Sequence, residues 1–246
     1  MLSWELQDGI AVITFDHPPV NALDLEVLRA IRHTLESVDA AEPRAAILTG
    51  TGSVFSAGAD LIRVLDGDED EIREAILYLG RAFRSIFTFP RPLVAAVNGH
   101  AIAGGAVIAC ACDHRVAAEG DARIGLAELR VGVPFPADAL EIVRTATGRY
   151  FEEVILFGRN YGVEDALSRG LVDEIVPADE VLPTALRRAE KLAAIPQAVY
   201  RLNKEAMRGP VVERIESYRE ANDVEAARLW ASEEVRASIR SFLDSL

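Results

Sequence analysis

Apolar and polar residues follow two patterns along this chain, and together they predict the order of strands and helices. Short apolar runs favour β-strands, which we place at 10–15, 45–49, 93–97, 114–118 and 171–176. Apolar residues that recur every three or four positions favour amphipathic helices, at 23–38, 70–88, 104–111 and 137–146. Strands and helices alternate, which is typical of the α/β class.

The last quarter of the chain changes character after Pro177. It contains charged, helix-favouring segments that Pro196 and the Gly209-Pro210 pair interrupt, so we expect separate helices at 179–194, 197–208 and 211–242. Their apolar residues need a partner surface. We therefore expect a core domain over 1–195 and a helical oligomerisation region over 196–246.

Charge and composition exclude several classes of protein. The formal net charge is −13, which argues against a nucleic-acid partner. Much of the acidic surplus lies at 66–71, which we interpret as a solvated loop. The first thirty residues lack the pattern of a signal peptide, and no apolar run is long enough to span a membrane, so we expect a cytoplasmic protein. The spacing of Cys110 and Cys112 favours buried small side chains.

Two segments rich in small residues could carry chemistry. Residues 50–61 and 98–106 each follow a predicted strand and lead toward a helix. Phe55 stands where a dinucleotide-binding motif needs its third glycine, and no Gly-Lys-Ser/Thr sequence follows for a P-loop. Close helix packing would by itself explain Gly104-Gly105. If the two turns meet, however, their backbone N–H groups could form an oxyanion hole.

These two segments resemble the oxyanion motifs of the enoyl-CoA hydratase/isomerase (crotonase) family. The first reads Phe-Ser-Ala-Gly-Ala-Asp-Leu at 55–61, and the second reads Asn-Gly-His-Ala-Ile-Ala-Gly-Gly-Ala at 98–106. Residues 19–23 and 112–115 are further typical features, so the resemblance covers about residues 5–205. It implies a spiral of β-β-α units with a helical C-terminal region. It also implies a homotrimer or a hexamer.

The resemblance assigns roles to particular residues. The N–H groups of Ala59 and Gly104 would hold the carbonyl oxygen of an acyl-CoA thioester, and Glu128 matches the family's second glutamate. Where the hydratases carry their first glutamate, this chain has Val107. Ala57 would lie along the CoA adenine, and Asp60 and Leu61 would continue that wall. The atypical stretch around Phe135 would shape the acyl pocket.

A single glutamate favours isomerisation over hydration. Moving a double bond from the 3- to the 2-position needs one base, whereas hydration in the family uses two carboxylates. The apolar neighbours of Glu128 should raise its pKa toward neutrality. A rewired hydratase remains an alternative, with Asp138 and Glu141 as substitutes by proximity only, although we expect both to be solvated acids at a helix start. A non-catalytic CoA-ester binding protein is a second alternative.

Other ligands receive little support from the sequence. None of the four histidines has a partner at metal-ligand spacing, so we expect no metal site. The substrate would itself bring the CoA group, so we expect no separate cofactor. Arg29, Arg63 and Lys204 could contact the CoA phosphates. The sequence does not choose among these three or define the acyl group.

Overall fold

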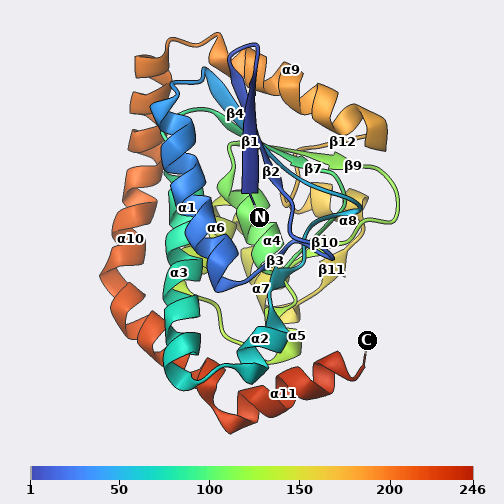
Figure 1. Ribbon diagram of the computed structural model, residues 1–246, viewed down its shortest axis with the longest axis vertical. Coiled ribbons are helices and arrows are strands. Elements are labelled where there is room, and N and C mark those ends of the chain that lie inside the picture. Colours follow the sequence, from blue (N-terminus) through green and yellow to red (C-terminus); the bar gives the residue numbers. More distant parts are fainter. Residues whose placement is uncertain (1, 246) are drawn as a thin grey trace.

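In the computed structural model, which describes residues 2–245, a six-stranded sheet, a four-stranded sheet and a short two-stranded sheet pack against helices (Figure 1). Neighbouring strands of the larger sheet are parallel, except for an antiparallel pair at one edge. Its strands, in spatial order, are β1 (Leu2–Gln7), β2 (Ile10–Phe15), β4 (Ala45–Gly50), β7 (Leu93–Val97), β9 (His114–Ala118) and β12 (Glu174–Val176).

The second sheet is built from short strands that follow those of the first. Its spatial order is β11 (Asn160–Tyr161), β10 (Ile124–Gly125), β8 (His100–Ile102) and β5 (Val54–Ser56). The chain therefore repeats one path three times: β4 leads to β5, β7 to β8 and β9 to β10, each followed by a helix. This repeated β-β-α path confirms the predicted spiral.

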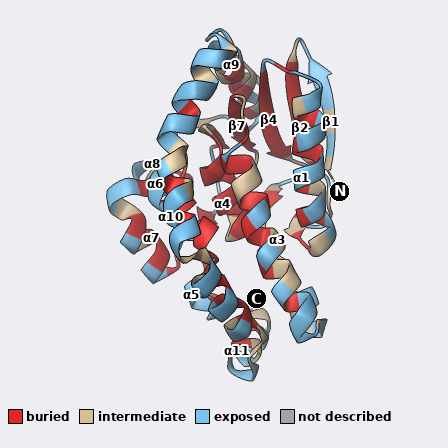
Figure 2. Cartoon of the chain, turned by 90° about the vertical axis from the view of Figure 1, so that its left-hand side faces the viewer, coloured by how far each residue is buried: buried red, intermediate tan, exposed pale blue. Residues whose placement is uncertain are grey.

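The helices enclose this spiral, and one of them lies at its centre. All the residues of α4 (Gly104–Ala111) are buried, whereas the outer helices leave part of their surface exposed (Figure 2). The others are α1 (Leu25–Ala40), α2 (Leu61–Asp66), α3 (Glu69–Phe87), α5 (Glu128–Val131), α6 (Ala137–Thr147), α7 (Phe151–Phe157), α8 (Val163–Ser168), α9 (Val181–Ala193), α10 (Gln197–Ala231) and α11 (Glu233–Leu243).

The N-terminal strand β1 was not predicted, although the sequence carries a signal for it. Asp8 and Gly9 both have positive φ angles, at 48° and 79°, and form the two-residue turn between β1 and β2. An Asp-Gly pair between strands is typical of this turn. At the other edge, the predicted strand at 171–176 is shorter: only Glu174–Val176 pairs, while Leu171 and Val172 are buried without belonging to a strand.

The prediction of separate helices on either side of Gly209-Pro210 was wrong. One helix, α10, runs from Gln197 to Ala231 with Pro210 inside it. Packing of α10 against α3 and α6 compensates for the hydrogen bond that a proline removes, because Val211 and Ile215 next to it are buried in the core. The break comes instead at Ser232, whose hydroxyl accepts a hydrogen bond from the Val235 N–H and caps α11.

The acidic run at 66–71 is not the predicted solvated loop. Asp68 is the N-cap of α3, and Glu71 completes a capping box by accepting a hydrogen bond from the Asp68 N–H. Acidic side chains near a helix N-terminus also interact favourably with its dipole. The run is therefore a helix-start signal. In the described range, no helix is both long and apolar enough to cross a membrane.

Candidate active site

The two small-residue turns lie in direct contact at the centre of the molecule. β6 (Gly58–Ala59) pairs with β3 (Ala22–Leu23), next to the first residue of α4. A Cβ atom added to Gly58 would come within 2.9 Å of the Gly104 nitrogen and 2.8 Å of the Ala103 Cβ. Gly58 also has a φ of +83°, which side chains disfavour. The close approach of the turns therefore requires glycine here.

The backbone at this contact leaves two N–H groups available as donors. The Asp60 N–H points toward β3, since it lies 3.5 Å from the Leu23 carbonyl oxygen. Successive residues of a strand face opposite ways, so the Ala59 N–H points away from β3. Gly104 is the first residue of α4, where an N–H has no acceptor within the helix. Both residues line the same cavity.

Glu128 lines this cavity from a third element, the start of the short helix α5. Its side chain is 9% exposed, and no described residue gives its Oε2 atom a hydrogen-bond partner. Burial raises the pKa of the Glu128 carboxyl to about 8, as the apolar neighbours predicted. Gly132, in a left-handed conformation, ends the helix four residues later. An unpaired, buried carboxyl is costly in a core but useful as a proton carrier.

The cavity has a volume of about 90 Å³ and brings together most of the predicted site residues. The strand and helix ends contribute small residues, while the stretch after α5 contributes an aromatic ring. The predicted residues that line it are Ala57, Ala59, Leu61, Gly104, Glu128 and Phe135. The sequence motifs therefore converge on one place although they are up to 78 positions apart (135 − 57).

Val107 and Asp60 lie elsewhere. Val107 is fully buried in the main hydrophobic core and is not part of the cavity lining. The Asp60 carboxylate caps α2 by accepting hydrogen bonds of 3.1 Å from the N–H groups of Ile62 and Arg63. Asp60 lines a second, larger cavity of about 400 Å³ between α1, α2 and α3, which shares Ala59 with the first.

The three basic residues suggested for the CoA phosphates have different surroundings. Arg63 lines the larger cavity and is well exposed. Arg29 pairs with Glu74 on the outer surface of α1 and α3. Lys204 is buried against Asp113, 2.7 Å away, and burial lowers its pKa to about 8. Of the three, only Arg63 borders either of the two cavities.

Asp138 and Glu141 are not the solvated acids that we expected. Asp138 is 1% exposed and accepts two hydrogen bonds from the Arg84 guanidinium, at 2.7 and 3.0 Å. Glu141 is 3% exposed and pairs with Arg214 at 2.5 Å. Neither lines the cavity beside Glu128. Both carboxylates face α3 or α10, so their interior position follows from helix packing that the sequence pattern did not reveal.

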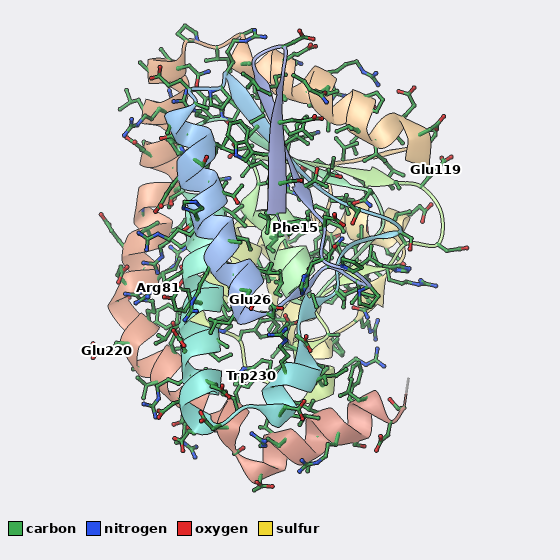
Figure 3. The ribbon with its side chains drawn as sticks, in the orientation of Figure 1. Phe15, Glu26, Arg81, Glu119, Glu220 and Trp230 are labelled. Carbon is green, nitrogen blue, oxygen red and sulfur yellow. The ribbon has the colours of Figure 1, made fainter. Side chains whose placement is uncertain are left out.

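Sequence reasoning missed the residues that close the cavity from other helices. Leu79 and Phe83 come from α3, and Trp230 and Phe242 come from α10 and α11. Figure 3 shows Trp230 in the lower part of the molecule, between α2 and α3. The sequence signal for these residues is their amphipathic helical periodicity. This pattern identifies the buried face of a helix but not the cavity that the face lines.

A comparison with known protein families agrees with the resemblance that the two turns and Glu128 carry. Residues 5–246 match the family model described as "Enoyl-CoA hydratase/isomerase". The chain belongs to the enoyl-CoA hydratase/isomerase family. Relatives of this family are named as enzymes, so the chain is an enzyme of the enoyl-CoA hydratase/isomerase type.

Some similar members of the family are named hydratases, and others are named isomerases. A putative enoyl-CoA hydratase of Thermus thermophilus is 36% identical over 211 residues, which cover 82% of each chain. The mitochondrial enoyl-CoA delta isomerase 1 of Mus musculus is 31% identical, over 97% of this chain and 84% of the mouse protein. The crystal structure of the human mitochondrial delta3-delta2-enoyl-CoA isomerase matches with a TM-score of 0.94 at 29% identity, covering 99% of this chain and 97% of the human one.

Proposed function

We propose that this enzyme moves the double bond of a 3-enoyl-CoA to the 2-position, with Glu128 as its single acid and base. One observation carries the proposal: the buried Oε2 atom of Glu128 has no hydrogen-bond partner among the described residues, and Glu128 shares a cavity lining with Ala59 and Gly104. No other Asp or Glu lines this cavity among the described residues. The similarity to the human and mouse isomerases supports the same reaction.

The reaction needs two proton transfers and one stabilised anion. The Glu128 carboxylate takes a proton from C2, and the electron pair of that bond spreads over the dienolate to the thioester oxygen. The N–H groups of Ala59 and Gly104 donate hydrogen bonds to that oxygen. The protonated Glu128 then returns the proton to C4, and the double bond forms between C2 and C3. A carboxyl with a pKa of about 8 can both accept and donate this proton near neutral pH.

Hydration would require a second group to hold and activate water. Val107 has no polar atom and lies outside the cavity lining. Asp138 and Glu141 could replace the missing first glutamate only if they reached the cavity, but both are held in ion pairs with arginines. The cavity therefore supports one-base chemistry better than the two-carboxylate chemistry of water addition.

We place the CoA group along Ala57. Arg63 is well exposed, so its guanidinium can contact a CoA phosphate at the surface. Proton transfer between carbon atoms requires no metal or separate cofactor. We also propose a homotrimer or hexamer, because α10 exposes Val199, Leu202 and Met207 on one side.

The two reactions are separated by giving the purified enzyme each substrate in turn. With 3-hexenoyl-CoA we expect the absorbance of the conjugated 2-enoyl thioester to rise. With 2-hexenoyl-CoA we expect its loss through hydration to be at least a hundredfold slower. Glu128→Gln keeps the shape of the side chain but removes the base, and should lower isomerisation by about 10²–10⁴-fold.

Binding of a saturated acyl-CoA provides the control for this variant. Hexanoyl-CoA cannot react, so its dissociation constant reports whether Glu128→Gln still forms the site. We expect the constant to change by less than about threefold. Rapid hydration of 2-hexenoyl-CoA, or isomerisation that survives in Glu128→Gln, would contradict the proposal.

A further inference from the structure

Trp230 separates two cavities that would otherwise join. Its side chain, together with Ala59 and Leu79, lines both the 90 Å³ cavity beside Glu128 and the 400 Å³ cavity between α1, α2 and α3. Ala59 is small, and the Leu79 side chain is aliphatic and smaller than an indole. The indole ring of Trp230 is therefore the largest part of the partition.

The structure holds this indole in place from several sides. Trp230 is 3% exposed and packs with Ile72 and Ile76 of α3 and with Val133. Its Nε1–H donates a hydrogen bond of 2.9 Å to the carbonyl oxygen of Pro134, in the stretch between α5 and α6. Burial and this hydrogen bond favour the observed position of the ring. The indole therefore stands between the two cavities.

The small cavity limits how much of an acyl chain fits beside Glu128. An apolar cavity of about 150 Å³ accommodates the six carbon atoms of benzene, so 90 Å³ has room for roughly four carbon atoms. C2, C3 and C4 must lie beside Glu128 for the proposed proton transfer. About one further carbon atom then fits before the chain meets Trp230 and Phe242.

We propose that Trp230 sets the upper limit on acyl length, so that the enzyme accepts acyl groups of about six carbon atoms or fewer. This inference rests on the proposed function, because it assumes that the acyl group lies beside Glu128. Replacing the indole with a smaller side chain would join the two cavities. The Ile72, Ile76 and Leu28 side chains of the larger cavity would then receive the end of a longer chain.

Calorimetric titration with hexanoyl-CoA and decanoyl-CoA tests the limit without any turnover. A site that buries each added methylene gains about fourfold in affinity per methylene. We expect the unmodified enzyme to bind decanoyl-CoA no more tightly than hexanoyl-CoA. Trp230→Leu should improve the affinity for decanoyl-CoA relative to hexanoyl-CoA at least tenfold. Because neither ligand reacts, this result is independent of whether the enzyme is an isomerase.

The chain offers a matched control in its other tryptophan. Trp4, on β1, lies outside both cavities, so Trp4→Leu should leave the ratio of the two affinities unchanged. A second readout needs no change at Trp230. In Trp4→Phe the remaining indole is Trp230, and its fluorescence should change when hexanoyl-CoA binds but not when CoA alone binds.

Two results would overturn the proposal. One is an unmodified enzyme that binds decanoyl-CoA at least tenfold more tightly than hexanoyl-CoA. The other is a folded Trp230→Leu variant with an unchanged ratio of affinities. If Trp230→Leu does not fold, the fluorescence of Trp4→Phe decides the question, and an indole signal that ignores the acyl group counts against the proposal.

Discussion

At the scale of single residues, the candidate site depends on one carboxyl that the fold leaves without a partner. Two other buried acids pair with arginines, Asp138 with Arg84 and Glu141 with Arg214. Glu128 has no such partner for its Oε2 atom among the described residues, and burial alone raises the pKa of this carboxyl to about 8. An acid of this kind is protonated over most of the neutral range and must lose its proton before it can act as a base.

This raised pKa predicts the pH dependence of the reaction. Below pH 8 the fraction of Glu128 in its charged, basic form rises about tenfold per pH unit, and above pH 8 it reaches a plateau. We therefore expect kcat/KM for 3-hexenoyl-CoA to increase from pH 6 to pH 8 and then to level off. A profile that is already flat at pH 6 would show that the acting base has an ordinary carboxylate pKa.

At the scale of elements, the sequence predicted the strands and helices of the spiral well because their buried positions coincide with apolar runs and with helical periodicity. The ends of α4, for example, agree with the predicted range 104–111. Breaks were predicted less well: Pro210 lies within a helix because tertiary packing outweighs its local cost, and Ser232 provides the actual stop. The sequence motifs led to Ala59, Gly104 and Glu128, but no local pattern could show that Trp230 closes the same cavity.

The contact between β6 and α4 should be sensitive to a single methyl group. Gly58→Ala would strain a φ of +83° and also press a Cβ to within 2.9 Å of the Gly104 nitrogen. Gly52 has a similar φ of +70°, but open space surrounds its added Cβ, so Gly52→Ala serves as a control for the backbone strain. We expect a loss of about 1 kcal/mol in unfolding free energy for Gly52→Ala.

The cost of Gly58→Ala should exceed that of the control by at least about 1–3 kcal/mol, because overpacking adds to the backbone strain. Its kcat should also fall, since the two N–H donors would move apart. Chemical denaturation and isomerase assays of both variants measure these effects. Equal effects of the two substitutions would mean that the turns are not in close contact.

At the scale of the whole molecule, ion pairs join the long C-terminal helix α10 to α3 and α6. Arg84 of α3 contacts both Asp138 of α6 and Glu216 of α10. Arg214 of α10 reaches Glu141 of α6. Helices far apart in the sequence are thereby held in one arrangement, which also positions Trp230 and Phe242 over the cavity.

Asp138→Asn should therefore affect stability and not the chemical step. The substitution removes one of the two anionic partners of Arg84, while Glu216 remains, and we expect a loss of about 1–3 kcal/mol in unfolding free energy. Because Asp138 lies outside the cavity lining, kcat of the folded protein should remain within about threefold. A variant that is stable but a hundredfold slower would show that Asp138 takes part in the reaction.

The most direct test follows the proton itself. The enzyme is given 3-hexenoyl-CoA labelled with deuterium at C2, in ordinary water, and the 2-enoyl product is analysed by mass spectrometry and NMR after less than one complete turnover of the substrate pool. If one shielded carboxyl, Glu128, carries the proton from C2 to C4, a substantial part of the product should carry deuterium at C4. Product whose C4 hydrogen comes entirely from water would contradict transfer by a single buried base.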